Sequence, residues 1–550
     1  MKTNLIVSIF ALFIGNGFLA AQEEMKLEWE TRLEHRTTAE TGFSQEKGIS
    51  FAATEKEISV IDNNTGKVKW NKTFKTISEE IRKVDEIIPM WDANTLFLFD
   101  KKLGKDKVVC VDMETGNMLW WTEKYQNLSE YNVVFVSEMD AFALALKDAL
   151  VMIKVRSGEE IWQTSKFKGA VGSYIVADGN LIMLNYKPTA LGALFAGLKN
   201  QLVKIDMKNG DVIWDTDYIG LVERKVISGE PVLSMKLENG KLFLTLNGLQ
   251  VYDVNSGTRL WSCAYDVNIN EVVKAPMGAV KWGVYNAIAD PLIVGQDVYI
   301  IDMQGKRKQY IKKYDLNSGK LLWTSPELEG VRVAPNLYLS GDKLVLQVGG
   351  VVETQAYIVK RTRQPDGSYV VTKEWRRDFP TIKPCRLMGF NATNGAQLWE
   401  SERFKKGITN ALIHDGKVIA CSGKAFYSMN IDNGKENYEL SLGDDNIGLA
   451  TKILTYKDNI VVVGEKGVAL HSPSDGKFLK SSKYKKSMLD DMSGQYLLMR
   501  TEGGDIACFD LETCKHKRFD ARKDAQSYLA DDGSYVVVFE KKTASRLSTR

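Results

Sequence analysis

The carboxylates with the widest chemical potential in this chain are five aspartates that recur with one fixed spacing. Each stands four positions before a glycine and eight before a tryptophan: Asp62-Gly66-Trp70, Asp112-Gly116-Trp120, Asp206-Gly210-Trp214, Asp253-Gly257-Trp261 and Asp315-Gly319-Trp323. Arrayed carboxylates can bind a metal ion or act as general acids and bases. An aspartate ahead of a glycine also forms tight turns, because its oxygen accepts backbone N–H groups and glycine reaches a positive φ. Since these aspartates recur at a turn position, we expect the structural role.

The histidines and cysteines form no catalytic or metal-binding pattern. The four histidines stand singly, and no two of the six cysteines are adjacent. The chain lacks Gly-x-Ser-x-Gly, His-Glu-x-x-His and a phosphate-binding loop. Cys508 and Cys514 flank the last turn of the pattern. Two interpretations stay open for them: a disulfide across a hairpin, or burial as small apolar side chains. The sequence thus predicts no catalytic residue and no metal site.

The aspartate spacing belongs to a repeat that runs along most of the chain. Five further copies are less complete: Lys154-Gly158-Trp162, Asn391-Gly395-Trp399, Asn430-Gly434-Tyr438, Ser472-Gly476-Lys480 and Asp510-Cys514-Arg518. Successive turns lie 38 to 76 residues apart, about fifty on average. A repeat of this length between strand-like segments is typical of propeller blades. We predict an all-β protein, a β-propeller of four-stranded antiparallel blades, eight or more and about ten by the repeat count.

Each repeat can supply four short strands and one large tryptophan side chain. Residues 231–262 show the strands well, with Asn-Gly and Asp/Gly turns between them. The tryptophan four residues past the glycine falls on the outgoing strand and offers an apolar body with one donor. We expect it to wedge between adjacent blades and to donate its indole N–H to a carbonyl of the neighbouring blade.

The two ends of the sequence complement each other. Trp29 lies in residues 26–30, which resemble an outer strand without inner strands of its own. Residues 526–530, 534–540 and 543–547 resemble inner strands without an outer one. Pairing the two ends would close the ring and remove free sheet edges. This arrangement predicts ten or eleven blades in one closed assembly; in the alternative, the divergent C-terminal repeats form a second stack of sheets.

The overall composition is that of an ordinary soluble globular protein. Hydrophobic residues make up 44% and charged residues 26% of the chain. With 73 basic and 70 acidic side chains the formal charge is only +3. Because no dense Lys/Arg run stands out, the charge pattern of a nucleic-acid-binding protein is missing. We expect a monomer that binds no nucleic acid.

The first 21 residues fit a secretory signal peptide. Lys2 gives a positive start, residues 5–14 are apolar, and small residues lead to Ala20 and Ala21. The apolar run is shorter than the roughly twenty residues that span a bilayer, and no cysteine follows it to carry a lipid. We predict cleavage after Ala20 or Ala21. Residues 22–550 would then form one exported propeller domain without a transmembrane segment, periplasmic or at the cell surface.

Two of the best-preserved repeats carry a family resemblance. Residues 111–120 (Val-Asp-Met-Glu-Thr-Gly-Asn-Met-Leu-Trp) and 314–323 (Tyr-Asp-Leu-Asn-Ser-Gly-Lys-Leu-Leu-Trp) resemble the tryptophan-docking repeats of the quinoprotein-like β-propeller family. The resemblance covers essentially all of the mature chain. In that family, one branch oxidises alcohols or sugars with pyrroloquinoline quinone (PQQ) and calcium at the ring centre. The other branch lacks the cofactor and includes the scaffold lipoprotein of outer-membrane barrel assembly.

The sequence departs from both named branches of that family. Alcohol-oxidising members have a vicinal cysteine pair, which is absent here, and no Cys-x-x-Cys-His haem motif occurs. No motif places calcium ligands or a catalytic aspartate at the ring centre. The chain also lacks the lipidation cysteine of the scaffold lipoprotein and has more blades. We therefore expect no cofactor, with PQQ and calcium as the alternative.

Three insertions between the repeats are the candidate partner-binding segments, because function in propellers concentrates on loops. The first spans residues 187–200 and places Leu191, Leu194, Phe195 and Leu198 at helical spacings of three and four. Such an apolar stripe can dock on a partner or pack back onto the ring.

The second insertion, residues 272–290, carries Trp282 and Tyr285. Aromatic side chains on a loop can stack on a sugar or planar ring, or cover a gap between blades. If both were exposed along one rim, they would favour a carbohydrate-binding module.

The third insertion, residues 360–384, carries Arg363 and Trp375 on either side of the turn-forming residues 364–368. We expect a protruding basic hairpin, which either contacts an acidic partner or surface or remains solvated.

These observations favour an exported, non-catalytic propeller that binds or scaffolds a protein partner in the bacterial envelope. The alternative is a PQQ- and calcium-dependent dehydrogenase of alcohols or sugars, and a carbohydrate-binding module comes third. The identity of the partner is not encoded in any motif.

Overall fold

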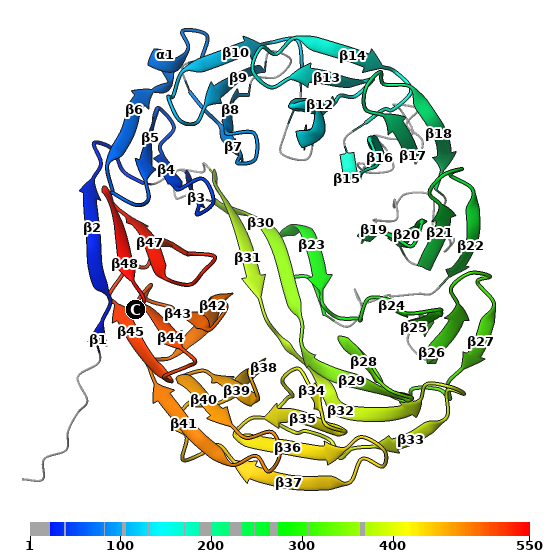
Figure 1. Ribbon diagram of the computed structural model, residues 1–550. Coiled ribbons are helices and arrows are strands. Elements are labelled where there is room, and N and C mark those ends of the chain that lie inside the picture. Colours follow the sequence, from blue (N-terminus) through cyan, green and yellow to red (C-terminus); the bar gives the residue numbers. More distant parts are fainter. Residues whose placement is uncertain are drawn as a thin grey trace, which may run out of the picture.

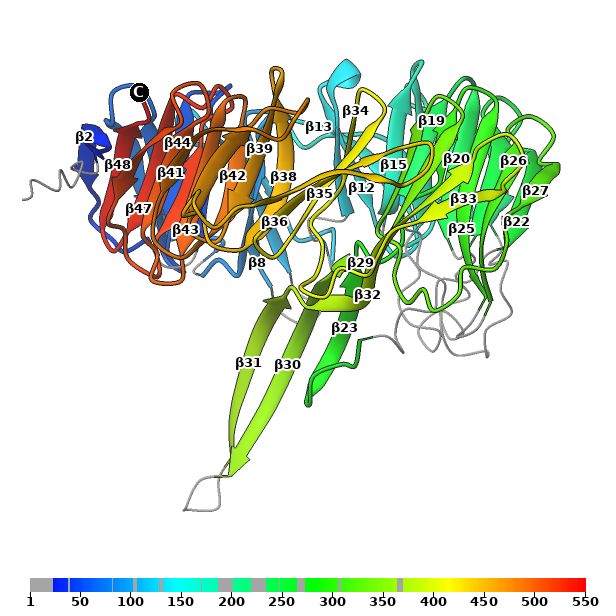
Figure 2. The same ribbon diagram turned by 90° about the horizontal axis from the view of Figure 1, so that it is seen from below.

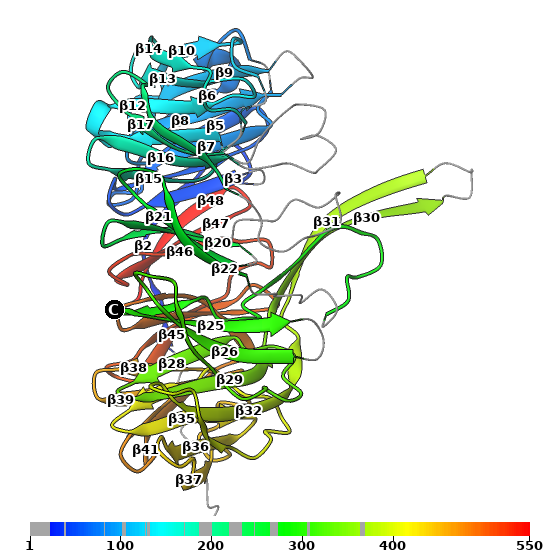
Figure 3. The same ribbon diagram turned by 90° about the vertical axis from the view of Figure 1, so that its right-hand side faces the viewer.

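The structure is a computed structural model, and eleven sheets of its described residues form a closed ring (Figure 1). It describes residues 23–550 except 38–39, 82, 102–105, 127, 129–131, 170, 186–200, 219–233, 247, 265–272, 305–307 and 364–368. Each sheet is one blade of a β-propeller, so the predicted fold class is confirmed. One further sheet of three strands projects from the ring (Figures 2 and 3).

The first blade shows how the sequence builds a sheet. Its strands are β3 (Glu40–Ser44), β4 (Ile49–Ala53), β5 (Glu57–Asp62) and β6 (Val68–Thr73), paired in that order. β3 lies at the inside of the ring and β6 at the rim (Figure 1). All five residues of β4 are buried, because a middle strand is covered by a neighbouring blade on each face. This explains why the middle strands are apolar without alternation.

The other ten blades repeat this meander. Blade 2 has β7 (Glu86–Met90), β8 (Thr95–Asp100), β9 (Lys107–Asp112) and β10 (Met118–Thr122); blade 3 has β11 (Val133–Val136), β12 (Ala141–Ala145), β13 (Leu150–Lys154) and β14 (Glu160–Thr164); blade 4 has β15 (Val171–Ala177), β16 (Asn180–Asn185), β17 (Gln201–Asp206) and β18 (Val212–Asp217); blade 5 has β19 (Ser234–Glu238), β20 (Lys241–Leu246), β21 (Gly248–Asp253) and β22 (Arg259–Ala264). Blade 6 has β24 (Leu292–Val294), β25 (Asp297–Gln304), β26 (Lys308–Asp315) and β27 (Leu321–Thr324); blade 7 has β28 (Asn336–Ser340), β29 (Lys343–Val351), β32 (Thr381–Asn391) and β33 (Gln397–Glu400); blade 8 has β34 (Leu412–His414), β35 (Lys417–Ser422), β36 (Ala425–Asn430) and β37 (Glu436–Ser441); blade 9 has β38 (Ala450–Tyr456), β39 (Asn459–Gly464), β40 (Gly467–His471) and β41 (Phe478–Lys483). Helices are limited to α1 (Phe74–Ile77) and the 3-10 turn η2 (Ser137–Met139) in the described part of the chain.

The last two blades close the ring with the N-terminal segment. Blade 10 has β42 (Ser487–Ser493), β43 (Tyr496–Thr501), β44 (Ile506–Asp510) and β45 (Lys515–Phe519), and β1 (Glu23–Glu24) adds to β45 in parallel. Blade 11 has β46 (Gln526–Leu529), β47 (Tyr535–Glu540) and β48 (Thr543–Ser548), and its outer strand is β2 (Lys26–Arg32). The predicted pairing of the two chain ends is therefore confirmed, in a single ring of eleven blades.

Apolar side chains fill every junction between neighbouring blades. A separate cluster of buried residues joins each pair, from Phe51 and Leu96 between the first two blades to Ala52 and Val537 between the last and the first. The core is thus distributed around the ring as eleven clusters of the described residues. Each blade depends on both of its neighbours, which is the energetic reason for closure.

The repeated tryptophans dock on the next blade as predicted. Each donates its indole N–H to the carbonyl of the residue after the first position of the next signature, over 2.6–3.1 Å: Trp29 to Asn63, Trp70 to Met113, Trp120 to Val155, Trp162 to Met207, Trp214 to Val254, Trp261 to Leu316, Trp323 to Ala392 and Trp399 to Ile431. The ring of each tryptophan covers the signature glycine. A Cβ built on Gly116 would stand 2.5 Å from the Trp70 ring, so only glycine fits.

The docking weakens toward the C-terminus. Tyr438 replaces tryptophan and points its hydroxyl at Pro473 O over 3.4 Å. At the next junction the ammonium of Lys480 donates to Glu512 O. Arg518 holds the third position and pairs with Glu24 of β1 at 3.7 Å. Polar contacts thus replace the indole in the divergent repeats.

The signature aspartates cap their own turns. Asp253 Oδ1 accepts from Asn255 N at 3.1 Å, Ser256 N at 2.8 Å and Ser256 Oγ at 2.9 Å. Gly257 closes the turn at φ 69°.

All six cysteines are free and buried, so Cys508 and Cys514 do not form a disulfide. The signature aspartates and the cysteines thus both serve the fold.

Candidate functional site

The two faces of the ring carry different turns and connections between strands. On one face, the signature turn and the turn between the first two strands of most blades are bonded together, as by Asn63 N to Gly48 O at 2.8 Å and Val254 N to Gly240 O at 3.1 Å. The other face holds the links between blades and the turns between the two middle strands. The described parts of the second and third predicted insertions fall in a link and in a middle-strand turn of this second face, which we call the connection face.

A three-stranded sheet, here called the arm, extends from the connection face (Figures 2 and 3). It consists of β23 (Ala279–Tyr285), β30 (Glu353–Arg363) and β31 (Tyr369–Asp378), with β30 in the middle. The hairpin is inserted between β29 and β32 of blade 7, whereas β23 comes from the link between blades 5 and 6. At roughly 3.3 Å per residue, the eleven residues of β30 reach about 35 Å. Two insertions distant in sequence therefore build one structure.

Backbone geometry and a small apolar cluster fix the base of the arm. Gly349 and Gly350 have φ values of 73° and 120°, and a Cβ on Gly349 would stand 2.1 Å from Pro384 O. Here β29 bends out of the ring toward β30. The cluster that packs under the arm contains Ala287, Val333, Val352 and Ile382. The arm is thus anchored to the ring by packing as well as by its two connections.

Pairing in the arm separates the predicted aromatic residues. Tyr285 pairs with Glu353, whereas Trp282 pairs with Ala356. Because side chains alternate along a strand, the two aromatic residues belong to opposite faces of the sheet. Tyr285 is 49% exposed, whereas the indole nitrogen of Trp282 is buried and lacks a partner among the described residues. The two do not line one rim.

The face with Tyr285 carries a charged and apolar cluster. Arg377 forms a bidentate pair with Glu353, Nε to Oε1 at 2.6 Å and Nη2 to Oε2 at 2.9 Å. The Arg377 guanidinium also lies 5.0 Å from the centre of the Phe379 ring, which is 46% exposed. Hydrogen bonding to Arg377 lowers the pKa of Glu353 below its ordinary value. By the register of β30 and β31, positions 363 and 375 belong to this same face.

The predicted site residues are only partly within the described structure. Tyr285 and Trp282 are placed with their side chains, and Arg363 and Trp375 only by strand and register. Leu191, Leu194, Phe195 and Leu198 lie outside the described residues. Phe379 was not predicted, although alternation along the hairpin, with Phe379 four positions after Trp375, could have indicated it, whereas Arg377 belongs to the basic residues of the predicted hairpin.

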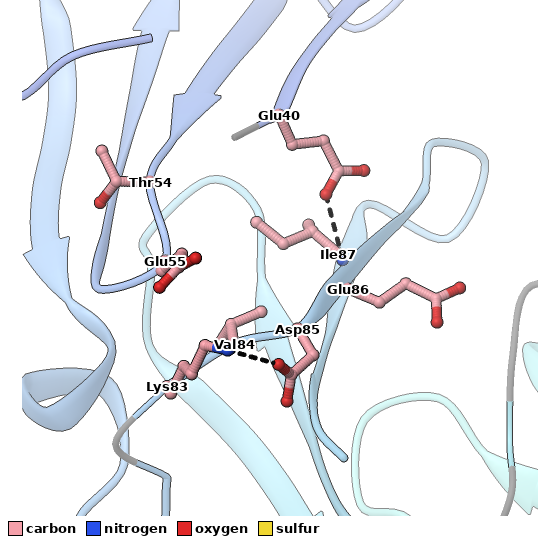
Figure 4. A pocket seen from close by; sticks show the side chains of 8 residues that line it. All are labelled: Glu40, Thr54, Glu55, Lys83, Val84, Asp85, Glu86 and Ile87. Atoms are coloured by element: carbon pink, nitrogen blue, oxygen red, sulfur yellow. Dashed lines mark hydrogen bonds and ion pairs between the residues drawn. The ribbon is translucent and has the colours of Figure 1, made fainter. Parts of the chain in front are cut away.

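The connection face also holds shallow polar hollows beside the first blade. One of about 190 Å³ is lined by Glu40, Thr54, Glu55, Lys83, Val84, Asp85, Glu86 and Ile87 (Figure 4). Its charges are largely engaged, because Glu40 Oε2 accepts from Ile87 N at 3.2 Å and Lys83 pairs with Asp85 at 2.9 Å. Hydrogen bonding to Lys83 lowers the pKa of Asp85. This hollow is smaller than the roughly 300 Å³ of ordinary ligand sites. A neighbouring hollow of about 480 Å³ is lined by Thr37, Glu40, Thr41, Asp524, Gln526, Tyr528 and Lys541.

A calcium-bound quinone would require a group of hard oxygen ligands, six to eight around the ion. No group of three His, Cys, Asp or Glu side chains in the described part of the chain lies close enough to hold a metal ion. Likewise, no helix among the described residues is long and apolar enough to cross a membrane.

Fold and repeat together define a tryptophan-docking β-propeller, one face of which carries the three-stranded arm. The chain matches the PQQ-like repeat family described as outer membrane protein assembly factor BamB, over residues 54–262, 199–362 and 307–548. It belongs to this family. No curated protein matches the sequence.

Several solved structures of low sequence identity are similar to the chain. BamB from Moraxella catarrhalis is 12% identical, covers 71% of this chain and 94% of its own, and has a TM-score of 0.29. The computationally designed Ika8 protein is 13% identical, with coverages of 71% and 100% and a TM-score of 0.34. The C-terminal WD40 domain of Sif2 is 10% identical, with coverages of 68% and 90% and a TM-score of 0.34.

Proposed function

We propose that this chain is an exported, non-catalytic scaffold that holds a protein partner in the cell envelope through its connection face and arm. One observation carries the proposal. The arm is assembled from insertions of two separate parts of the chain, yet the ring closes through clusters made by the blades alone. A structure that the ring does not need for closure, and that extends about 35 Å from it, is suited to reaching another molecule.

The surface chemistry of the arm supports protein binding. Tyr285 and Phe379 are half exposed on the face that also carries Arg377. Tyrosine, phenylalanine and arginine are enriched at protein interfaces, where they supply large contact areas with few flexible bonds. The family description names an assembly factor of the outer membrane, which agrees with a role in assembling other proteins.

Site-specific photocrosslinking tests the proposal directly. A photoreactive phenylalanine analogue replaces Tyr285 or Phe379 in the full chain, expressed in its native envelope. Ile213 provides a matched control, because it is 49% exposed but lies on β18 at the rim. We expect a discrete crosslinked protein from the two arm positions and none from the rim. Crosslinks from Ile213 alone would contradict the proposal.

Removal of the arm hairpin supplies the second test. Residues 352–380 are replaced with an Asn-Gly turn that joins β29 to β32, a two-residue connection like the one between β35 and β36. The ring should fold with nearly unchanged stability, and the partner should no longer co-purify. Retention of the partner by a folded, armless ring would show that the arm is not its binding site.

The cofactor expectation has its own measurement. Titration of the purified chain with PQQ in the presence of calcium should give no saturable heat and no shift in melting temperature. Micromolar or tighter binding would instead support the dehydrogenase alternative, and a screen of alcohols and sugars with an artificial electron acceptor would follow.

A further inference from the structure

The outer edge of β31 is open along its length within the described part of the chain. The arm sheet has the order β23, β30, β31, so β31 is an edge strand. All ten of its residues pair with β30, from Thr354–Asp378 to Arg363–Tyr369, without a bulge. A long regular edge is a template on which another strand can pair.

The hydrogen bond at the base of the hairpin identifies the groups on that edge. Val352 N donates to Pro380 O at 3.0 Å, so residues 352 and 380 form a hydrogen-bonded pair. In an antiparallel ladder such pairs alternate with non-bonded pairs. Positions 370, 372, 374, 376 and 378 therefore bond to β30, and positions 369, 371, 373, 375 and 377 present their N–H and C=O groups outward. These five positions form the edge.

The edge lacks most of the features that natural proteins use to protect exposed strands. Edges are ordinarily shortened, bulged, interrupted by proline or loaded with charge. β31 has ten residues, no proline and no bulge against β30, and residues 369–372 read Tyr-Val-Val-Thr without a charge. Valine, threonine and tyrosine favour strands. The half of β31 nearest the tip is thus suited to pairing.

The charges on β31 do not suit pairing with a second copy of the chain. Two antiparallel β31 strands related by a two-fold axis place one residue opposite itself. Near the middle of the strand, that residue is Lys373 or Glu374. Like charges directly opposite each other destabilise a strand pair. A different partner strand avoids this repulsion.

The hairpin favours an acidic partner. Residues 353–378 contain six basic side chains, Lys360, Arg361, Arg363, Lys373, Arg376 and Arg377, against the four acidic ones Glu353, Asp366, Glu374 and Asp378. Two of the acidic groups are already paired, Glu353 with Arg377 and Asp378 with Arg376 at 2.6 Å. An incoming strand with acidic side chains would complement this excess and place a negative charge opposite Lys373.

We propose that β31 binds an extended acidic segment of the envelope partner as a fourth strand of the arm. The inference rests on the proposed function and specifies how its partner is held. Main-chain hydrogen bonds to the five outward positions supply affinity, and the alternating side chains of the arm face select the sequence.

A direct test uses a fluorescent peptide of alternating glutamate and valine, eight residues long, with the full-length protein. We expect saturable binding, and slower amide hydrogen exchange at positions 371, 373 and 375. The substitution Val371→Pro removes one outward N–H without touching the bonds to β30, whereas Val371→Thr keeps it. Val371→Pro should weaken binding about tenfold, as expected for one or two lost hydrogen bonds, and Val371→Thr should not.

A second measurement covers the case in which Val371→Pro fails to fold. The same peptide with N-methyl groups at alternate residues loses its own donors to β31 and should not bind to the unmodified protein. A lysine-for-glutamate peptide tests the charge preference and should bind more weakly.

Three outcomes would overturn strand addition: no binding of the acidic peptide, equal binding to both Val371 variants, or binding of the N-methylated peptide. If Tyr285 and Phe379 still crosslink a partner in those cases, the scaffold function stands and only this binding mode is lost. Absence of the crosslinks as well would remove the proposed function itself.

Discussion

The indole of Trp29 donates to the carbonyl oxygen of Asn63 over 2.9 Å, although the two residues belong to the last and first blades of the ring. Arg546 of β48 donates to the same oxygen at 2.8 Å and stacks 3.6 Å from the Tyr535 ring centre. The closing junction therefore has two donors on one carbonyl. The N-terminal segment that carries Trp29 completes the ring at its final seam.

We expect Trp29→Ala to cost about 3 kcal/mol of stability, because it leaves a cavity at the seam and removes a hydrogen bond. Trp121→Ala is the matched control, since Trp121 is 38% exposed on the rim and docks on no glycine. Urea unfolding of both variants measures the difference. Equal losses would show that tryptophan docking does not hold the seam.

Two glycine substitutions separate backbone strain from docking. Gly116 and Gly240 have φ values of 65° and 71°, but a Cβ meets the Trp70 ring only at Gly116 and nothing within 4 Å at Gly240. Gly240→Ala should cost about 1–2 kcal/mol for the left-handed backbone. Gly116→Ala should cost about 1–3 kcal/mol more, because the indole must move. Thermal unfolding of both proteins tests this, and similar melting temperatures would contradict it.

The signature carboxylates should make the ring sensitive to acid. Hydrogen bonds from Ser256 lower the pKa of Asp253, and those from Ser318 lower the pKa of Asp315, below 3.8. A carboxyl with a depressed folded-state pKa stabilises the protein above its unfolded pKa, and this stability is lost as the pH falls through the folded value. Melting temperature should fall below about pH 4, and less steeply for a variant with Asp253→Asn and Asp315→Asn. Parallel curves would contradict the assignment.

The cysteines should be inert in the folded protein. Burial raises the pKa of Cys110 and Cys508 to about 12 and that of Cys514 to about 11. Because the thiolate is the reactive form, iodoacetamide at pH 8 should label none of the six thiols in the native ring. Without reductant, denaturation should make all six reactive by mass spectrometry. Four labels instead of six would indicate a disulfide after all.

Much of the ring could be predicted from the sequence, because each repeat contains the residues that form its own turn and its junction with the next blade. Gly257 and Asp253 indicated the turn, and Trp261 indicated the junction with the next blade. The closing strand around Trp29 was readable because an outer strand had no inner partners. Local turn chemistry and strand alternation are sufficient to predict those parts of the ring in which neighbouring blades have nearly the same structure.

The arm was readable only in part. The hairpin around residues 364–368 had a clear turn signal, but its pairing with β23 joins segments some seventy positions apart. No repeat or local pattern links them. The opposite faces of Trp282 and Tyr285 follow from their odd spacing once β23 is known to be a strand, and that was not evident within an insertion.

The position of the arm within blade 7 determines how a pulling force on the arm is transmitted to the ring. β30 and β31 continue directly from β29 and β32, the two middle strands of that blade. A pull along the arm is transmitted lengthwise into these strands, which are flanked by β28 and β33. Their hydrogen bonds would be loaded together, in shear, and not opened one at a time. The arm is thus mounted on the two strands of blade 7 that have a neighbouring strand on each side.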